Sequence, residues 1–229
     1  MPEAMLLLGI DTCGPSGSVA LGRLDGRGVE ILGETELEGR NYSATLVTAV
    51  AGLLEQAGVT LAAVRGIVVV NGPGSFTGVR VGLSTAKGLA EGAGIPVVAV
   101  SRLEVLAGKA GAASAALDAH RGEVYLRVER MGQEPEELLA GERELAGIAL
   151  VPMRVAVCDE GAASLLAAAW PETELVNCTA PLASDALRWC AARPMGAGGT
   201  DAALLDGHYL RRSDAEIFGE AAANGAQRA

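Results

Sequence analysis

The sequence has few aromatic residues and no strong basic cluster, and both shortages restrict what the chain can bind. Phe, Trp and Tyr make up 3% of the 229 residues, too few for a surface that stacks nucleic-acid bases. The 28 acidic residues outnumber the 18 basic ones, the formal net charge is -10, and the longest basic cluster is Arg211 and Arg212. We therefore do not expect this chain to bind RNA or DNA by itself.

Histidine, paired cysteines and long apolar runs are also scarce. Two histidines, His120 and His208, cannot form a multi-histidine metal site, and no metal site is predicted. The four cysteines show no C-x-x-C spacing, which favours free thiols in a reducing compartment. No apolar run reaches the ~18 residues of a membrane span, and no positively charged segment precedes the first apolar run. These patterns predict a cytoplasmic protein without membrane contact.

What the sequence does contain is an alternation of strand and helix patterns, which predicts an α/β fold. The predicted strands lie at 5–10, 18–21, 28–37, 66–71, 96–100, 114–117, 123–128, 154–158 and 174–178. The predicted helices lie at 43–57, 77–91, 102–109, 161–169 and 183–192. Asp11 and Asp118 each end an apolar strand and open a hairpin, which suggests two related halves. We place a first lobe at 1–103, a second at 104–218, whose last segment packs back on the first, and a flexible tail at 219–229.

The most specific motif is Asn-Gly-Pro-Gly-Ser-Phe-Thr-Gly-Val-Arg at 71–80, between a predicted strand and a predicted helix. Glycine amides at a helix start can cradle a phosphate, although the spacing matches neither the dinucleotide fingerprint nor the P-loop. The alternative is a tight turn capped by Ser75 or Thr77. Asp11 could likewise hold a metal-bound nucleotide, act as a general base or cap its own turn. The candidate nucleotide-binding residues are Asp11, Thr12, Gly72, Pro73, Gly74, Ser75, Phe76, Thr77, Gly78 and Arg80.

No catalytic residue is predicted, because neither Gly-x-Ser-x-Gly nor His-Glu-x-x-His occurs. The helices predicted at 43–57 and 77–91 suggest binding instead. Apolar residues cover roughly 200° of the first helix, more than the ~100° that packing on one sheet requires. The second is rich in glycine, each costing about 1 kcal/mol relative to alanine. Either a partner or the chain's own second half covers these helices. The candidate partner interface is Leu46, Val47, Val50, Leu53, Leu54, Gly78, Gly82, Thr85, Ala86 and Leu89.

Four segments together resemble the bacterial TsaB (YeaZ) family. They are Ile10-Asp11-Thr12 with 18–21, the glycine motif at 71–80, Asp-Ala-His-Arg-Gly-Glu-Val-Tyr at 118–125, and Tyr-Leu-Arg at 209–211 before 214–216. The resemblance runs from about 5 to 216. It implies a two-lobed fold related to actin-like and sugar-kinase ATPases, with RNase H-like lobes that are each a mixed sheet with flanking helices. It also implies a non-catalytic role in forming N6-threonylcarbamoyladenosine at position 37 of transfer RNAs that read codons beginning with A.

The resemblance further implies partners. These are a TsaD-type catalytic subunit, which packs on the two first-lobe helices, and a small TsaE-type ATPase. The same surface supports homodimers when the chain is alone, and transfer RNA is met only through the complex. No tightly held cofactor is implied, and ATP or ADP would bind at the interface with the partner. TsaD carries two metal-binding histidines where this chain has Arg102 and Leu106, which cannot ligate a metal. Tyr42 stands where the family commonly has histidine, which leaves the polar contacts there open.

Two other functions compete with a supporting subunit. An active small-molecule kinase or ATPase of the same fold would use Asp11 and the glycine motif, with 196–200 as the one candidate adenosine pocket. A peptidase ranks last, because the sequence shows neither zinc-ligand spacing nor an arranged nucleophile.

Overall fold

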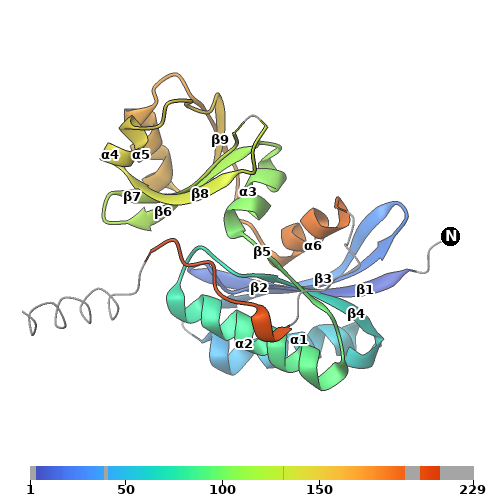
Figure 1. The fold of residues 1–229 in the computed structure, drawn as a ribbon. Coiled ribbons are helices and arrows are strands. Elements are labelled where there is room, and N and C mark those ends of the chain that lie inside the picture. Colours follow the sequence, from blue (N-terminus) through green and yellow to red (C-terminus); the bar gives the residue numbers. More distant parts are fainter. Residues whose placement is uncertain (1–3, 39–40, 131, 194–201, 212–229) are drawn as a thin grey trace, which may run out of the picture.

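The computed structural model describes residues 4–38, 41–130, 132–193 and 202–211, which form two lobes, each built on a five-stranded sheet (Figure 1). In the first sheet the strand order is β3-β2-β1-β4-β5. Its strands are β1 (Met5–Asp11), β2 (Ser16–Asp25), β3 (Gly28–Glu38), β4 (Val64–Val70) and β5 (Val97–Val100). β1 pairs antiparallel with β2 and parallel with β4, so the sheet is mixed.

The second sheet repeats this arrangement. Its strands are β6 (Ser114–His120), β7 (Glu123–Val128), β8 (Glu136–Gly141), β9 (Arg154–Val157) and β10 (Glu174–Asn177), in the order β8-β7-β6-β9-β10. β6 pairs antiparallel with β7 and parallel with β9, as β1 does with β2 and β4. Both sheets therefore share one topology, which confirms the predicted mixed sheets and two related halves.

In the first lobe, helices cover both faces of the sheet. Apolar residues of α1 (Tyr42–Gln56) and α2 (Phe76–Ala93) pack with those of the strands in one core. In Figure 1 these two helices lie side by side on one face, and α6 (Ala183–Ala191) lies on the other. Ala183, Ala186 and Leu187 of α6 are fully buried in the same core. A helix from late in the chain thus completes the first lobe.

The second lobe receives a helix from the first half in the same way. α3 (Arg102–Ala110) follows β5 but packs Leu103 and Leu106 against residues of β6, β7 and β9. The opposite face of the second sheet is covered by α5 (Glu160–Ala169) and the short α4 (Glu142–Ala146). α3 and α6 also contact each other, so each helix links the two lobes.

Two predicted element boundaries hold well, and two elements were missed. α1 and α2 begin one residue before the predicted 43–57 and 77–91. β8 and α4 were not predicted. Short turns of 3-10 helix lie at Leu61–Ala63 and Ala202–Leu204. The predicted tail at 219–229, the segment 214–216 and the candidate adenosine pocket at 196–200 lie outside the described residues. Within the described part of the chain, no helix has both the length and the apolarity to cross a membrane.

Candidate functional site: the β1 turn, the glycine motif and the outer helix face

The glycine motif meets the turn after β1. β1 and β4 are parallel neighbours, with Ile10 opposite Val69, so the segments that follow them leave the sheet at the same edge. The amide of Ser75 donates a hydrogen bond to the carbonyl oxygen of Cys13 at 2.8 Å. The hydroxyl of Thr12 donates to the carbonyl oxygen of Gly78 at 2.7 Å. The β1–β2 turn is thus fastened to the first turn of α2.

Close backbone approach explains the glycines of this motif. A Cβ atom at Gly74 would lie less than 3.0 Å from the carbonyl oxygen of Cys13, and one at Gly78 would meet that of Thr12 equally closely. Gly82 is confined in the same way by the Thr12 hydroxyl. Ser75 caps α2, because its hydroxyl oxygen accepts from the amide of Gly78 at 3.2 Å. The contacts therefore support the tight-turn interpretation, in which glycine is required by packing.

Asp11 faces a cation supplied by the chain itself. The Nε atom of Arg102, the first residue of α3, lies 3.6 Å from the Oδ2 atom of Asp11, and both side chains are buried. The Oδ1 atom of Asp11 accepts a hydrogen bond from the amide of Cys13 at 2.8 Å. The Asp11 carboxylate and the Ser75 amide, which belong to the candidate nucleotide-binding residues, are thus engaged within the chain.

Cys13 and Tyr42 complete the packing around this turn. Burial raises the pKa of the Cys13 thiol well above its usual range, with the Asp11 charge adding to the effect, and its Sγ atom donates to the carbonyl oxygen of Val70. A thiol of this kind is a poor nucleophile. The Tyr42 hydroxyl donates to the carbonyl oxygen of Gly14 at 2.9 Å, and burial raises its pKa to about 12. Tyr42 therefore makes a polar contact at this position as a permanent donor.

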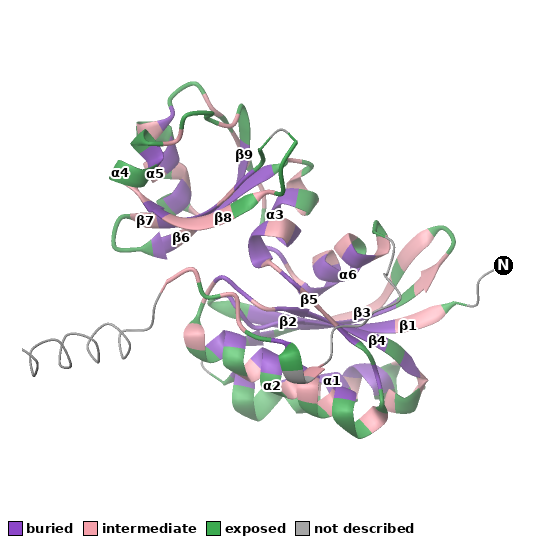
Figure 2. Cartoon of the chain, in the orientation of Figure 1, coloured by how far each residue is buried: buried purple, intermediate pink, exposed green. Residues whose placement is uncertain are grey.

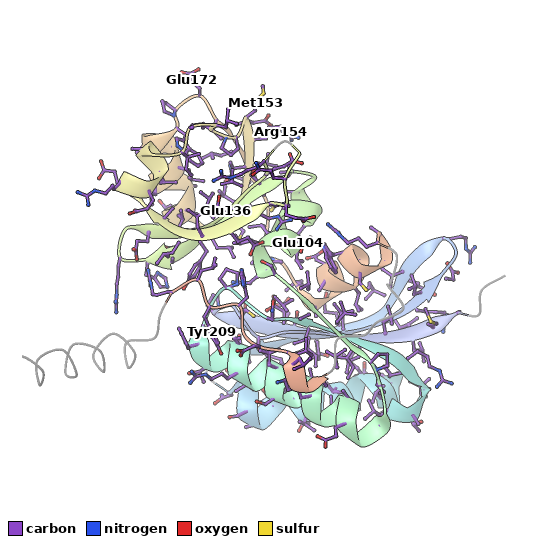
Figure 3. All side chains as sticks on the ribbon, in the orientation of Figure 1. Glu104, Glu136, Met153, Arg154, Glu172 and Tyr209 are labelled. Atoms are coloured by element: carbon purple, nitrogen blue, oxygen red, sulfur yellow. The ribbon has the colours of Figure 1, made fainter. Side chains whose placement is uncertain are left out.

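Eight of the ten predicted nucleotide-binding residues fall into two groups. Asp11, Thr12, Gly72, Gly74, Ser75 and Gly78 lie around the junction of turn and helix. Phe76 and Arg80 instead contact Tyr209, which is labelled in Figure 3. The rings of Phe76 and Tyr209 stack with centroids 4.5 Å apart, and the Arg80 guanidinium lies 5.3 Å from the Phe76 centroid. Pro73 is buried and Thr77 is exposed.

The second lobe has a corresponding turn at Asp118. The Oδ1 atom of Asp118 accepts from the amide of His120 at 2.7 Å, and its Oδ2 atom lies 2.9 Å from the Nδ1 atom of His120. A Cβ atom at Gly161, in the first turn of α5, would lie less than 3.0 Å from the Asp118 carboxyl group. Asp118 therefore caps its own turn, and a helix start packs closely on it, as α2 does beside Asp11.

The outward surface of α1 and α2 differs from the one predicted, and this is a correction. Seven of the ten candidate interface residues are buried within the chain: Leu46, Val50, Leu53, Leu54, Gly78, Gly82 and Ala86. Val47 is 56% exposed, whereas Thr85 and Leu89 are half-buried. Figure 2 shows the outward residues of the two helices as exposed. Most of these residues are small, although the charged Glu55, Arg80 and Glu91 are exposed as well. We call six of the exposed, uncharged residues the outer face: Ala44, Val47, Thr48, Ala51, Ser84 and Gly88.

Among the described residues, no group of three His, Cys, Asp or Glu side chains is placed to hold a metal ion. Sequence reasoning missed Arg102 as the partner of Asp11, and it also missed Glu137. The Glu137 carboxylate accepts from Ser101 at 2.6 Å and from Arg127 at 2.8 Å and faces His208 at 2.8 Å. Nothing in a strand that reads Glu-Glu-Leu-Leu-Ala-Gly identifies this role.

Known proteins resemble this chain over different extents. A family model described as TsaD, tRNA N6-adenosine threonylcarbamoyltransferase, matches residues 35–144. The tRNA threonylcarbamoyladenosine biosynthesis protein TsaB of Escherichia coli is 39% identical over 127 residues, 53% of each chain. TsaB of Bacillus subtilis is 41% identical over 125 residues, again 53% of each. The matched segment thus spans about half the length of these curated relatives.

A solved structure extends the similarity to most of the fold. YeaZ from Pseudomonas aeruginosa has a TM-score of 0.67 at 29% identity, and the match covers 90% of this chain and 100% of that one. A second structure from this organism, of an uncharacterized protein with similarity to peptidase YEAZ, has a TM-score of 0.70 at 28% identity. The sequence matches and the shared two-lobed fold together show that this chain is similar to the TsaB and YeaZ proteins.

Proposed function

We propose that this chain is a non-catalytic subunit that binds a TsaD-type transferase through the outer face of α1 and α2 and supports the formation of N6-threonylcarbamoyladenosine in transfer RNA. The observation that carries the proposal is the outer face itself. Its residues are small or weakly polar, and none of Ala44, Val47, Thr48, Ala51, Ser84 and Gly88 is charged. Two helices of a partner could approach such a surface closely.

The names of the relatives and of the matching family model support the pathway, and the interior of the chain supports a non-catalytic role. Asp11 is paired with Arg102, and the Cys13 thiol stays protonated. A TsaE-type ATPase, a homodimer of the isolated chain, ATP or ADP at the partner interface and a cytoplasmic location belong to this proposal. Contact with transfer RNA only through the complex fits the net charge of -10.

Co-purification with a tagged TsaD-type subunit tests the interface. We expect Val47→Arg and Gly88→Arg to abolish co-purification, because each adds a long charged side chain to the outer face. Met153→Arg is the matched control. Met153 is 87% exposed and lies at the far end of the second lobe (Figure 3), so this variant adds the same charge away from the proposed interface.

Retention of the partner by both outer-face variants would contradict the proposal, provided that their circular dichroism spectra match that of the unmodified chain. ATP turnover by the isolated chain tests the kinase alternative. A metal-dependent rate that Asp11→Asn abolishes would favour the kinase over the supporting subunit, whereas we expect no such rate.

A further inference from the structure

Residues 205–211, here called the strap, run from the first lobe to the second. Leu205 is buried in the first-lobe core, while Leu210 packs against the apolar cluster formed by α3 and the second sheet. Figure 1 shows this segment passing from the side of α2 toward the second lobe. A segment of this length therefore contacts both cores.

At its first-lobe end the strap is fastened to the glycine motif. The backbone amide of His208 donates to the carbonyl oxygen of Asn71 at 2.7 Å. The side-chain amide of Asn71 donates in turn to the carbonyl oxygen of Asp206 at 3.2 Å. Gly72 has a φ of 118°, and a Cβ there would lie less than 3.0 Å from the carbonyl oxygen of His208. The stacking of Tyr209 on Phe76 continues this attachment onto the first turn of α2.

At its second-lobe end the strap is held by charge. The Arg211 guanidinium donates to the carbonyl oxygen of Ala119 at 2.6 Å and pairs with the carboxylate of Glu123, on either side of the β6–β7 turn. Between the two ends, the Nε2 atom of His208 lies 2.8 Å from the Oε2 atom of Glu137 on β8. Charge-assisted contacts of this kind are among the stronger hydrogen bonds of a protein.

We propose that the strap fixes the orientation of the two lobes and links that orientation to the start of α2. The strap contacts the glycine motif at one end and the β6–β7 turn at the other. A change in the angle between the lobes must therefore break one set of contacts or pull on the other. This proposal goes beyond the proposed function, because it concerns contacts within a single chain and needs no partner.

Hydrogen exchange in the full-length chain tests this link with the variant Arg211→Gln. The contacts of Arg211 described above are all with residues of the second lobe. We expect faster exchange not only in the β6–β7 turn but also at the amides of Gly78 and Val79, by about fivefold. Arg154→Gln is the matched control. Arg154 pairs with Glu174 at 3.0 Å within the second lobe, and we expect it to leave Gly78 and Val79 unchanged.

The reciprocal variant keeps the test decisive if Arg211→Gln fails to fold. Tyr209→Leu removes the stack on Phe76, and we expect it to speed exchange at the amides of Glu123 and Val124 by a similar factor. Small-angle X-ray scattering of the same variants should show a larger radius of gyration than that of Arg154→Gln. Exchange that changes only at the end of the strap carrying the substitution, together with an unchanged scattering curve, would overturn the proposal.

Discussion

Two glycines of α2 that look alike in the sequence have opposite surroundings. A Cβ atom at Gly78 would clash with the carbonyl oxygen of Thr12, whereas one at Gly88 would have nothing within 4 Å. We expect Gly78→Ala to lower the free energy of unfolding by about 1–3 kcal/mol, because either the turn or the helix must shift. Urea denaturation followed by circular dichroism measures this change.

Gly88→Ala is the control on the same helix. It should leave stability unchanged or raise it by up to about 1 kcal/mol, because alanine favours the helix and meets no obstacle. Equal effects of the two substitutions would show that helix propensity, rather than the close approach of the β1–β2 turn, sets the stability change at Gly78.

Glu137 makes the free energy of unfolding depend on pH in the acidic range. Burial on its own would raise the pKa of its carboxyl group, but hydrogen bonds from His208, Ser101 and Arg127 together lower it below the usual 4.5. A pKa that is lower in the folded state stabilises the fold above the unfolded-state pKa, and this stabilisation is lost as the pH falls through the folded-state value. We expect Glu137→Gln to cost about 1–2 kcal/mol at pH 7 and much less at about pH 3.

Glu174→Gln provides the comparison for this pH series. The Glu174 side chain is 63% exposed and pairs with Arg154, so its loss should cost no more than about 0.5 kcal/mol at either pH. Urea denaturation at the two pH values distinguishes these outcomes. If Glu137→Gln and the unmodified chain lost stability in parallel on acidification, the hydrogen bonds to Glu137 would not be the source of the pH dependence.

At the scale of elements, α1 has one side buried in the core and one side exposed to solvent. Leu53 is buried against β3, where its Cδ2 atom would lie 3.0 Å from a Cβ added at Gly33, while Val47 is exposed. Leu53→Ala should lower the free energy of unfolding by about 2–5 kcal/mol, and Val47→Ala should change it by less than about 0.5 kcal/mol. Thermal or urea unfolding of both variants checks the assignment, and similar losses would contradict it.

Local patterns predicted most elements but not what covers them. The apolar stripe of α1 and the glycine motif before α2 placed every end of these two helices within two residues. A stripe reports which side of a helix is apolar and leaves open whether its own sheet or a partner lies against it. This is why buried residues such as Leu53 were assigned to the partner interface.

β8 was missed for a related reason. Its sequence, Glu-Glu-Leu-Leu-Ala-Gly, lacks the alternation and the β-branched residues that indicate a strand. Pairing with β7 determines its conformation, with Tyr125 opposite Leu139. Likewise, Arg102 and Asp11 lie far apart in the sequence, so only the packing of α3 between the lobes brings the two side chains together.

At the scale of the whole molecule, α3 and α6 each pack on the lobe formed mainly by the other half of the chain. α3 follows the first sheet and covers the second, while α6 follows the second sheet and covers the first. The stability of each lobe must therefore depend on residues that the sequence places in the other half. Local opening, measured by hydrogen exchange, reports such dependence strand by strand.

Leu187 and Leu166 make this dependence testable, because both are fully buried leucines from the second half of the chain. Leu187 lies on α6 in the first-lobe core, and Leu166 lies on α5 in the second-lobe core. Each Leu→Ala change should cost about 2–5 kcal/mol. We expect Leu187→Ala to speed exchange mainly in β1 and β2, and Leu166→Ala to speed it mainly in β6 and β7. Faster exchange mainly in the second sheet after Leu187→Ala would contradict this. In that case α6 would belong to the cooperative unit of the second lobe rather than to that of the first.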